Sequence, residues 1–147
     1  MARLRKIILL IVCVITLCSC DFDPIYYEKT LNAGDGRTIH IFAYDNYDVT
    51  RSYDYEVYEG SILIQDGALA FLAPHENPDF LMYKSVDGTI VGIYKKGQPN
   101  NILMLHDFST KENYPHVPGS YDGSEGLRLR NKLLSKLQKD FPDIKMK

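Results

Sequence analysis

The residues best suited to chemistry are His106 and Asp107, with His116 further along the chain. Imidazole and carboxylate groups can hold a metal ion or share a proton in acid–base catalysis. Their spacing fits neither a His-Glu-x-x-His frame nor an EF-hand, and a metal site needs three or four converging ligands. No Gly-x-Ser-x-Gly motif marks a serine hydrolase. Isolated histidines at strand ends are more often structural, so we expect no metal, no cofactor and no catalytic residue.

A long connecting segment, 107–123, follows His106 and contains two Pro, two Gly and two Tyr. Connections longer than about 12 to 15 residues are uncommon in compact domains unless they are functional or disordered. The segment is therefore predicted to be a binding surface. Together with an arginine of the helix predicted below, the candidate binding residues are His106, Asp107, Tyr114, His116, Tyr121 and Arg130.

The elements that must position these residues are mostly strands, because apolar and polar residues alternate with a period of two. Within 37–44 two isoleucines alternate with His40, which should face away from the core. In 52–58 the same alternation places Asp54 and Glu56 on one exposed face, as a solvated pair and not a glycosidase pair. Strands are expected at 25–31, 37–44, 52–58, 61–65, 80–86, 89–95 and 101–106, with 68–73 either a strand or a packed loop.

Turn signals predict two hairpins. Asn and Gly residues at 32–36 should close the first, and Asp87-Gly88 should form a two-residue connection, whose twist suits paired strands. The three strands within 80–106 would then make an antiparallel meander. Apolar residues fall on both faces of these strands, so both sides of this part of the sheet should be covered.

A C-terminal helix is predicted to cover one face of these strands. Ser124 is the expected N-cap, Glu125 suits the first turn, and Phe141-Pro142 ends the helix. Arg130 lies in the middle of the apolar arc. Its stem could lie along apolar surface with its head in water, or its guanidinium could pair with a sheet carboxylate or a ligand anion. The arc spans about 160° and comprises Leu127, Leu129, Leu133, Leu134, Leu137 and Phe141.

The N-terminus carries Arg3, Arg5 and Lys6 ahead of an uncharged apolar run at 7–17. A helix that spans a bilayer needs about 20 apolar residues. A basic start followed by a shorter apolar run is typical of a secretory signal peptide.

The end of this run, Leu17-Cys18-Ser19-Cys20, resembles the lipobox of bacterial lipoprotein precursors, in which Leu, a variable residue and a small residue precede the modified Cys. Cys18 does not fit, because bulky Leu17 would stand where the pattern has a small residue. The resemblance implies lipid attachment to the Cys20 sulfur, cleavage before Cys20 and usually acylation of the new amino group, and two or more chains anchor stably. Asp21 resembles the inner-membrane retention signal of enteric bacteria, a rule that differs between bacterial groups and leaves the leaflet open.

The composition limits the possible functions of the chain that remains after cleavage. Removal of residues 1–19 would leave 128 residues with 14 basic and 19 acidic side chains, a net charge of −5. That length suits one domain, and the acidic balance argues against nucleic acid as a partner. Cys20 would be the only cysteine, which excludes a disulfide, a thiolate zinc site and a CxxC redox centre. The eleven Tyr residues suit half-buried strands better than a Tyr-rich binding face.

The sequence thus predicts an α+β fold: about six to eight mostly antiparallel strands with one amphipathic C-terminal helix packed on them. We expect a signal peptide at 1–19, a lipidated tether at 20–24 and a single domain at 25–147. The expected protein is an envelope lipoprotein, anchored to the membrane through Cys20 and facing outside the cytoplasm. It would bind a protein, peptide or glycan without catalysis. The alternative is a small hydrolase or metal-dependent enzyme centred on His106, Asp107 and His116.

Overall fold

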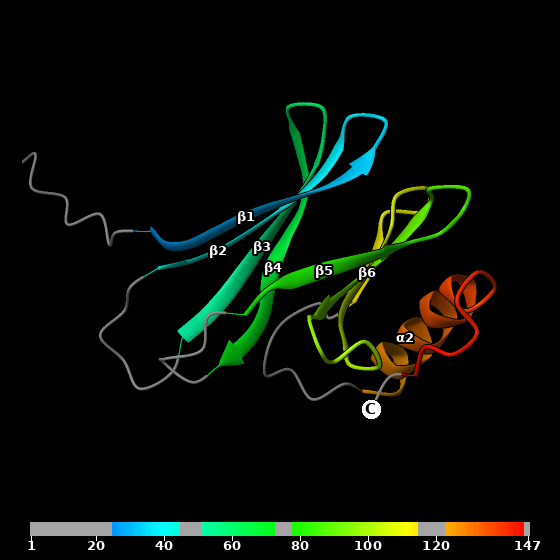
Figure 1. The fold of residues 1–147 in the computed structure, drawn as a ribbon. Coiled ribbons are helices and arrows are strands. Elements are labelled where there is room, and N and C mark those ends of the chain that lie inside the picture. Colours follow the sequence, from blue (N-terminus) through cyan, green and yellow to red (C-terminus); the bar gives the residue numbers. More distant parts are fainter. Residues whose placement is uncertain (1–24, 45–50, 73–77, 115–122, 146–147) are drawn as a thin grey trace, which may run out of the picture.

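The computed structural model describes residues 25–44, 51–72, 78–114 and 123–145, which form two antiparallel sheets and one helix (Figure 1). The predicted lipidation site at Cys20, together with His116 and Tyr121, lies outside the described residues. No helix in the described ranges is long and apolar enough to cross a bilayer.

Both sheets are meanders in which consecutive strands pair, so the α+β prediction with its C-terminal helix is confirmed. The first sheet contains β1 (Ile25–Gly34), β2 (Arg37–Tyr44), β3 (Arg51–Glu59) and β4 (Ile62–Leu72). The second sheet contains β5 (Phe80–Lys84), β6 (Ile90–Lys95), β7 (Ile102–Asp107) and β8 (Glu112–Tyr114), and α2 (Ser124–Leu137) follows it.

The main core lies between the two sheets. In β2 the residues Ile39, Ile41 and Ala43 are buried while His40 between them is half-buried, as the period of two predicts. Tyr53 from the first sheet and Phe80 from the second pack edge to face, with ring centroids 5.4 Å apart. Aromatic rings in this geometry add to the stabilisation from buried area, so this contact helps to hold the sheets together.

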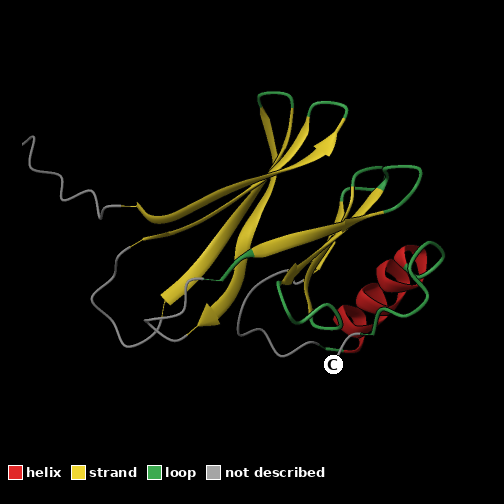
Figure 2. Ribbon diagram, in the orientation of Figure 1, coloured by secondary structure: helices red, strands yellow, loops and turns green. Residues whose placement is uncertain are grey.

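A second core lies between the second sheet and α2, which covers the opposite face of that sheet (Figure 2). The prediction that both faces of these strands are covered is thereby confirmed. Gly92 of β6 permits the close approach, because a Cβ there would lie 2.8 Å from the Cδ2 atom of Leu137. The buried apolar residues of this core are Ile90, Ile102, Leu105, Tyr114, Leu133, Leu137 and Ile144.

The Asp-Gly pairs at 35–36 and 87–88 behave differently. Asp35 and Gly36 form the two-residue connection between β1 and β2, both with positive φ, as primed turns require. Asp87-Gly88, predicted to do the same, instead lies within a longer turn that Ser85 and Ile90 close by a backbone hydrogen bond of 2.9 Å. The Asp87 carboxylate accepts hydrogen bonds from Ser85 Oγ and from the backbone N of Thr89, and these bonds hold the wider turn.

Three further details differ from the sequence-based prediction. A single strand, β4, runs through the break predicted at 66–67, and the predicted 107–123 connection begins with a turn and then contains β8. Strand β7 carries an irregularity opposite Ile93 and Tyr94, so Met104 lies in the inter-sheet core while Ile102 and Leu105 contact the helix side. One extra residue in a strand reverses the alternation of faces beyond it.

The helix begins one residue earlier than predicted. Gly123 is the N-cap, without a side-chain hydrogen bond, and Ser124 is the first helical residue. Leu127 was expected in the core but is 41% exposed, because it lies in the first turn beyond the edge of the sheet contact. Leu133 and Leu137 are fully buried, and Leu129, Leu134 and Phe141 are partly buried against them.

Candidate functional site

His106 lies on the side of β7 that faces the first sheet and is completely buried. Its Nδ1 atom is 3.2 Å from Oδ1 of Asn113, and Nδ2 of Asn113 donates a hydrogen bond to the Tyr55 hydroxyl. Because an amide oxygen only accepts, the neutral ring carries its proton on Nδ1. Its Nε2 atom has no hydrogen-bond partner among the described residues. Burial lowers the pKa of His106, with the bond to Asn113 opposing that effect.

Asp107, although adjacent in sequence, is buried on the helix side of the same strand. One carboxylate oxygen accepts hydrogen bonds from the backbone N atoms of Ser109 and Thr110, at 2.8 and 3.2 Å, and the other binds Nζ of Lys136 from α2. Burial alone would raise the pKa of Asp107, but the bonds from Lys136, Ser109 and Thr110 outweigh it and hold the pKa at about 2. Asp107 therefore fixes the β7–β8 turn and docks the helix.

The strand alternation thus separates His106 and Asp107 instead of joining them in one site. Tyr114 is buried in the core beneath the helix, so its side chain offers little surface to a ligand. No group of three His, Cys, Asp or Glu side chains within the described ranges is arranged to hold a metal ion. Among the residues predicted from the sequence, His106, Asp107 and Tyr114 therefore have structural surroundings, while His116 and Tyr121 lie outside the described residues.

Arg130 is partly exposed, with its Nε atom buried and lacking a hydrogen-bond partner in the described part of the chain. This matches a stem that lies along apolar surface more closely than a guanidinium paired with a sheet carboxylate.

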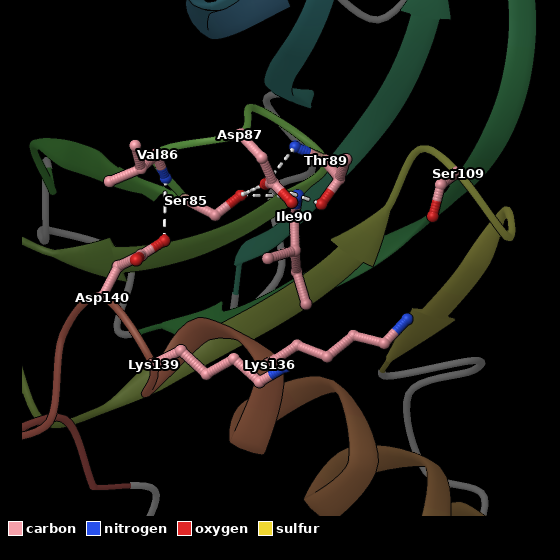
Figure 3. A pocket seen from close by; sticks show the side chains of 9 residues that line it. All are labelled: Ser85, Val86, Asp87, Thr89, Ile90, Ser109, Lys136, Lys139 and Asp140. Carbon is pink, nitrogen blue, oxygen red and sulfur yellow. Dashed lines mark hydrogen bonds between the residues drawn. The ribbon is translucent and has the colours of Figure 1, made fainter.

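A hollow of about 420 Å³ lies between the β5–β6 turn, Ser109 and the C-terminal end of α2 (Figure 3). Most polar groups that line it already bind one another. Asp140 accepts a hydrogen bond of 2.8 Å from the backbone N of Val86, and Asp87 binds Ser85 and Thr89. The Asp140 bond joins the turn to the segment that follows α2, so the hollow is explained as a junction between two parts of the chain.

The outer face of the first sheet has a different character. The strand pairing places Phe42 beside Glu28 on one side and Asp54 on the other, and Glu56 beside Asp66. We call this surface the acidic face. None of its described outward-facing side chains is Lys or Arg, because Lys29 and Arg37 point to the opposite side. Its outward-facing residues with large or charged side chains are Tyr26, Glu28, His40, Phe42, Tyr44, Asp54, Glu56, Tyr58, Leu63 and Asp66.

His40 connects the carboxylates at the centre of the acidic face. Its Nε2 atom is 2.9 Å from Glu28 and its Nδ1 atom is 3.5 Å from Glu56. Glu56 also accepts a hydrogen bond of 2.7 Å from the Tyr58 hydroxyl, which raises the pKa of Tyr58. The ring of Phe42 lies 5.3 Å from that of His40. The face therefore presents aromatic rings beside two carboxylates, those of Glu28 and Glu56, that neighbouring side chains hold in position.

A hollow of about 230 Å³ opens in the acidic face between β2, β3 and β4. It is lined by Phe42, Asp54, Glu56 and Asp66 from these three strands, together with Tyr55 and Gly67. A hollow with an aromatic side chain and three acidic residues can hold a positively charged group by cation–π and ionic contacts.

The sequence predicts Asp54 and Glu56 as a solvated pair on one face. They do share the outer face, where both are half-buried. What it lacked was the pairing register, which brings Phe42 and Asp66 beside them from neighbouring strands. The signal in the sequence was the absence of Lys and Arg at the outward positions of three successive strands.

Comparisons with protein-family models, with curated proteins and with solved structures found no match to this chain.

Proposed function

We propose that the protein is a bacterial envelope lipoprotein, anchored by acyl chains on Cys20, that binds a partner through the acidic face and catalyses no reaction. The binding role rests on one observation. Glu56 of β3 and Asp66 of β4 lie directly opposite one another on adjacent strands. Like charges in this position destabilise a sheet. Residues that violate a local stability rule are typical of functional sites.

The surroundings of the carboxylates support this interpretation. Glu28 is 62% exposed, and the described side chains around it supply His40 but no Lys or Arg. The buried carboxylate of Asp107, by contrast, has a lysine and two backbone donors. The stability of the fold explains the position of the Asp107 carboxylate. It does not explain why several carboxylates lie together at the surface around an aromatic ring.

The anchor proposal rests on the lipobox resemblance of residues 17–20. A chain extends by at most about 3.6 Å per residue, so residues 20–24 would keep the domain within about 20 Å of the bilayer. The net charge of −5 expected after cleavage gives no attraction to anionic lipid, so the acyl chains would supply the anchoring.

The binding surface can be tested by photo-crosslinking in the native envelope. A photoreactive residue at Thr30, an exposed residue of β1 that pairs with His40 of the acidic face, should give a specific adduct. The matched control is Val86, which is 89% exposed on the second sheet's turn and should give none. Adducts from Val86 but not from Thr30 would overturn the assignment of the surface.

The anchor can be tested with Cys20→Ser. We expect this variant to remain an unacylated precursor that is not cleaved at this site, whereas Cys18→Ser should be processed normally. Fatty-acid labelling of Cys20→Ser at the level of the unchanged protein would exclude Cys20 as the attachment site.

A further inference from the structure

We propose that the partner of the acidic face is an extended, cationic polypeptide segment, with one Arg or Lys side chain seated in the hollow beside Phe42. This inference rests on the proposed binding role of the acidic face and adds the chemistry of the partner.

Charge is the first argument. Four carboxylates, those of Glu28, Asp54, Glu56 and Asp66, lie on the outward side of the first sheet. Two basic residues of the first sheet, Lys29 and Arg37, are engaged on the other side, where Lys29 pairs with Asp79 and Arg37 with Glu59. A surface of one sign raises the local concentration of partners of the opposite sign.

The size and lining of the hollow give the second argument. Small-molecule pockets usually enclose about 300 to 1,000 Å³, whereas this hollow encloses about 230 Å³. It therefore suits a single long side chain better than a whole ligand. A guanidinium could lie against the Phe42 ring and still reach the carboxylates of Asp54 or Asp66, since a planar guanidinium both stacks and donates.

The spread of the carboxylates indicates a polypeptide and not a small cation. Glu28 lies on β1 and Asp66 on β4, three strand spacings apart. With about 4.8 Å between strands, the charged surface is about 14 Å wide. In an extended segment every second side chain points to the same side, so such a segment can place several cations across this width.

The test uses the full lipidated protein in nanodiscs of phosphatidylcholine, a lipid without net charge. Its fluorescently labelled probes are the capped peptides Arg-Ser-Arg-Ser-Arg-Ser-Arg and Glu-Ser-Glu-Ser-Glu-Ser-Glu. Fluorescence anisotropy should show binding of the arginine peptide that weakens as NaCl increases, and no binding of the glutamate peptide. Equal binding of the two peptides, or binding of neither, would overturn the proposal.

Two variants test whether the arginine peptide binds at the hollow beside Phe42. Asp66→Asn should lower the affinity for the arginine peptide about two- to fivefold, which is the loss expected for one exposed ion pair. Phe42→Leu, which keeps apolar bulk but removes the ring, should also weaken it about two- to fivefold. The control Asp143→Asn removes one exposed carboxylate from the C-terminal segment and should leave the affinity unchanged. Thermal unfolding of each variant verifies the fold.

The two proposals fail in different ways. If Thr30 gives adducts while Asp66→Asn and Asp143→Asn bind the arginine peptide equally, the binding surface stands but its cationic partner is wrong. If Thr30 gives no adduct and Val86 does, the surface itself is wrong. A glycan recovered on the Thr30 crosslinker would likewise exclude the polypeptide.

Discussion

The two sheets contain the same number of strands in the same order, yet their surroundings differ. The second sheet has the first sheet on one side and α2 on the other, whereas the first sheet has a core on its inner side and the acidic face on its outer side. On the covered sheet, polar groups such as Asp107 have partners that fix turns and docking. On the open face, polar groups are placed against one another in ways that stability does not require.

This difference separates polar residues that the fold requires from those that we propose to bind a partner. A buried carboxylate without partners would be expensive, so the partners of Asp107 are a condition of folding. On the open face, by contrast, the carboxylates of Glu28 and Glu56 contact His40, and Glu56 also accepts a hydrogen bond from Tyr58. The neighbouring pair His106 and Asp107 belongs to the covered sheet, and the acidic face belongs to the open one.

The largest expected effect tests whether α2 covers the second sheet. Leu137→Ala should lower the free energy of unfolding by about 2 to 5 kcal/mol, because Leu137 is fully buried between α2 and the second sheet. Leu127→Ala, at a position that is 41% exposed, is the control and should change it by less than about 0.5 kcal/mol. Urea unfolding followed by circular dichroism measures both. Equal effects would mean that α2 does not cover the sheet.

The next largest effect tests the contact between Asp107 of β7 and Lys136 of α2. Asp107→Asn should cost about 2 kcal/mol at pH 7, because a carboxylate with a folded pKa near 2 gains that stability from its partners. The sign is that of a lowered pKa: the stability is present above the unfolded value of about 3.9 and lost as the pH falls through 2. The acid limb of the stability profile should therefore flatten in the variant. An unchanged acid limb would contradict the role given to Asp107.

A smaller effect concerns His106. Burial lowers its folded pKa below the usual value of about 6.5, so the unfolded chain takes up a proton first. Stability should be complete above about pH 6.5 and fall as the pH decreases toward the folded pKa. His106→Gln should remove this part of the pH dependence in urea unfolding, whereas His40→Gln on the acidic face should retain it. Identical profiles for His106→Gln and the unchanged protein would refute the prediction.

The smallest effect has the opposite sign and tests the open face. Asp66→Asn should raise the free energy of unfolding by about 0.2 to 0.5 kcal/mol, because it relieves like charges opposed across β3 and β4. The gain should shrink in 1 M NaCl, where charges are screened. A loss of stability would indicate that Asp66 serves the fold.

Particular residues show how far the sequence could predict this arrangement. The alternation that buries Ile39 and Ile41 and turns half-buried His40 to the outer side was predictable, because a strand's period of two depends only on local order. The length of the Asp87-Gly88 turn was not, since the side chains of Ser85 and Thr89 decide it through hydrogen bonds to Asp87. The candidate binding residue Tyr114 became part of β8, which three residues form by pairing with β7.

Most of the strands, the helix, the lipobox resemblance and the two faces of regular strands such as β2 follow from the amino-acid sequence, because composition and periods within short segments set them. Only the tertiary structure decided which strand faces would be covered and which carboxylates would become neighbours. Burial depends on which elements meet, and neighbours across a sheet depend on register between segments far apart in the chain. For this reason Asp107 became a structural residue, while Glu56 and Asp66 came to lie opposite one another beside Phe42.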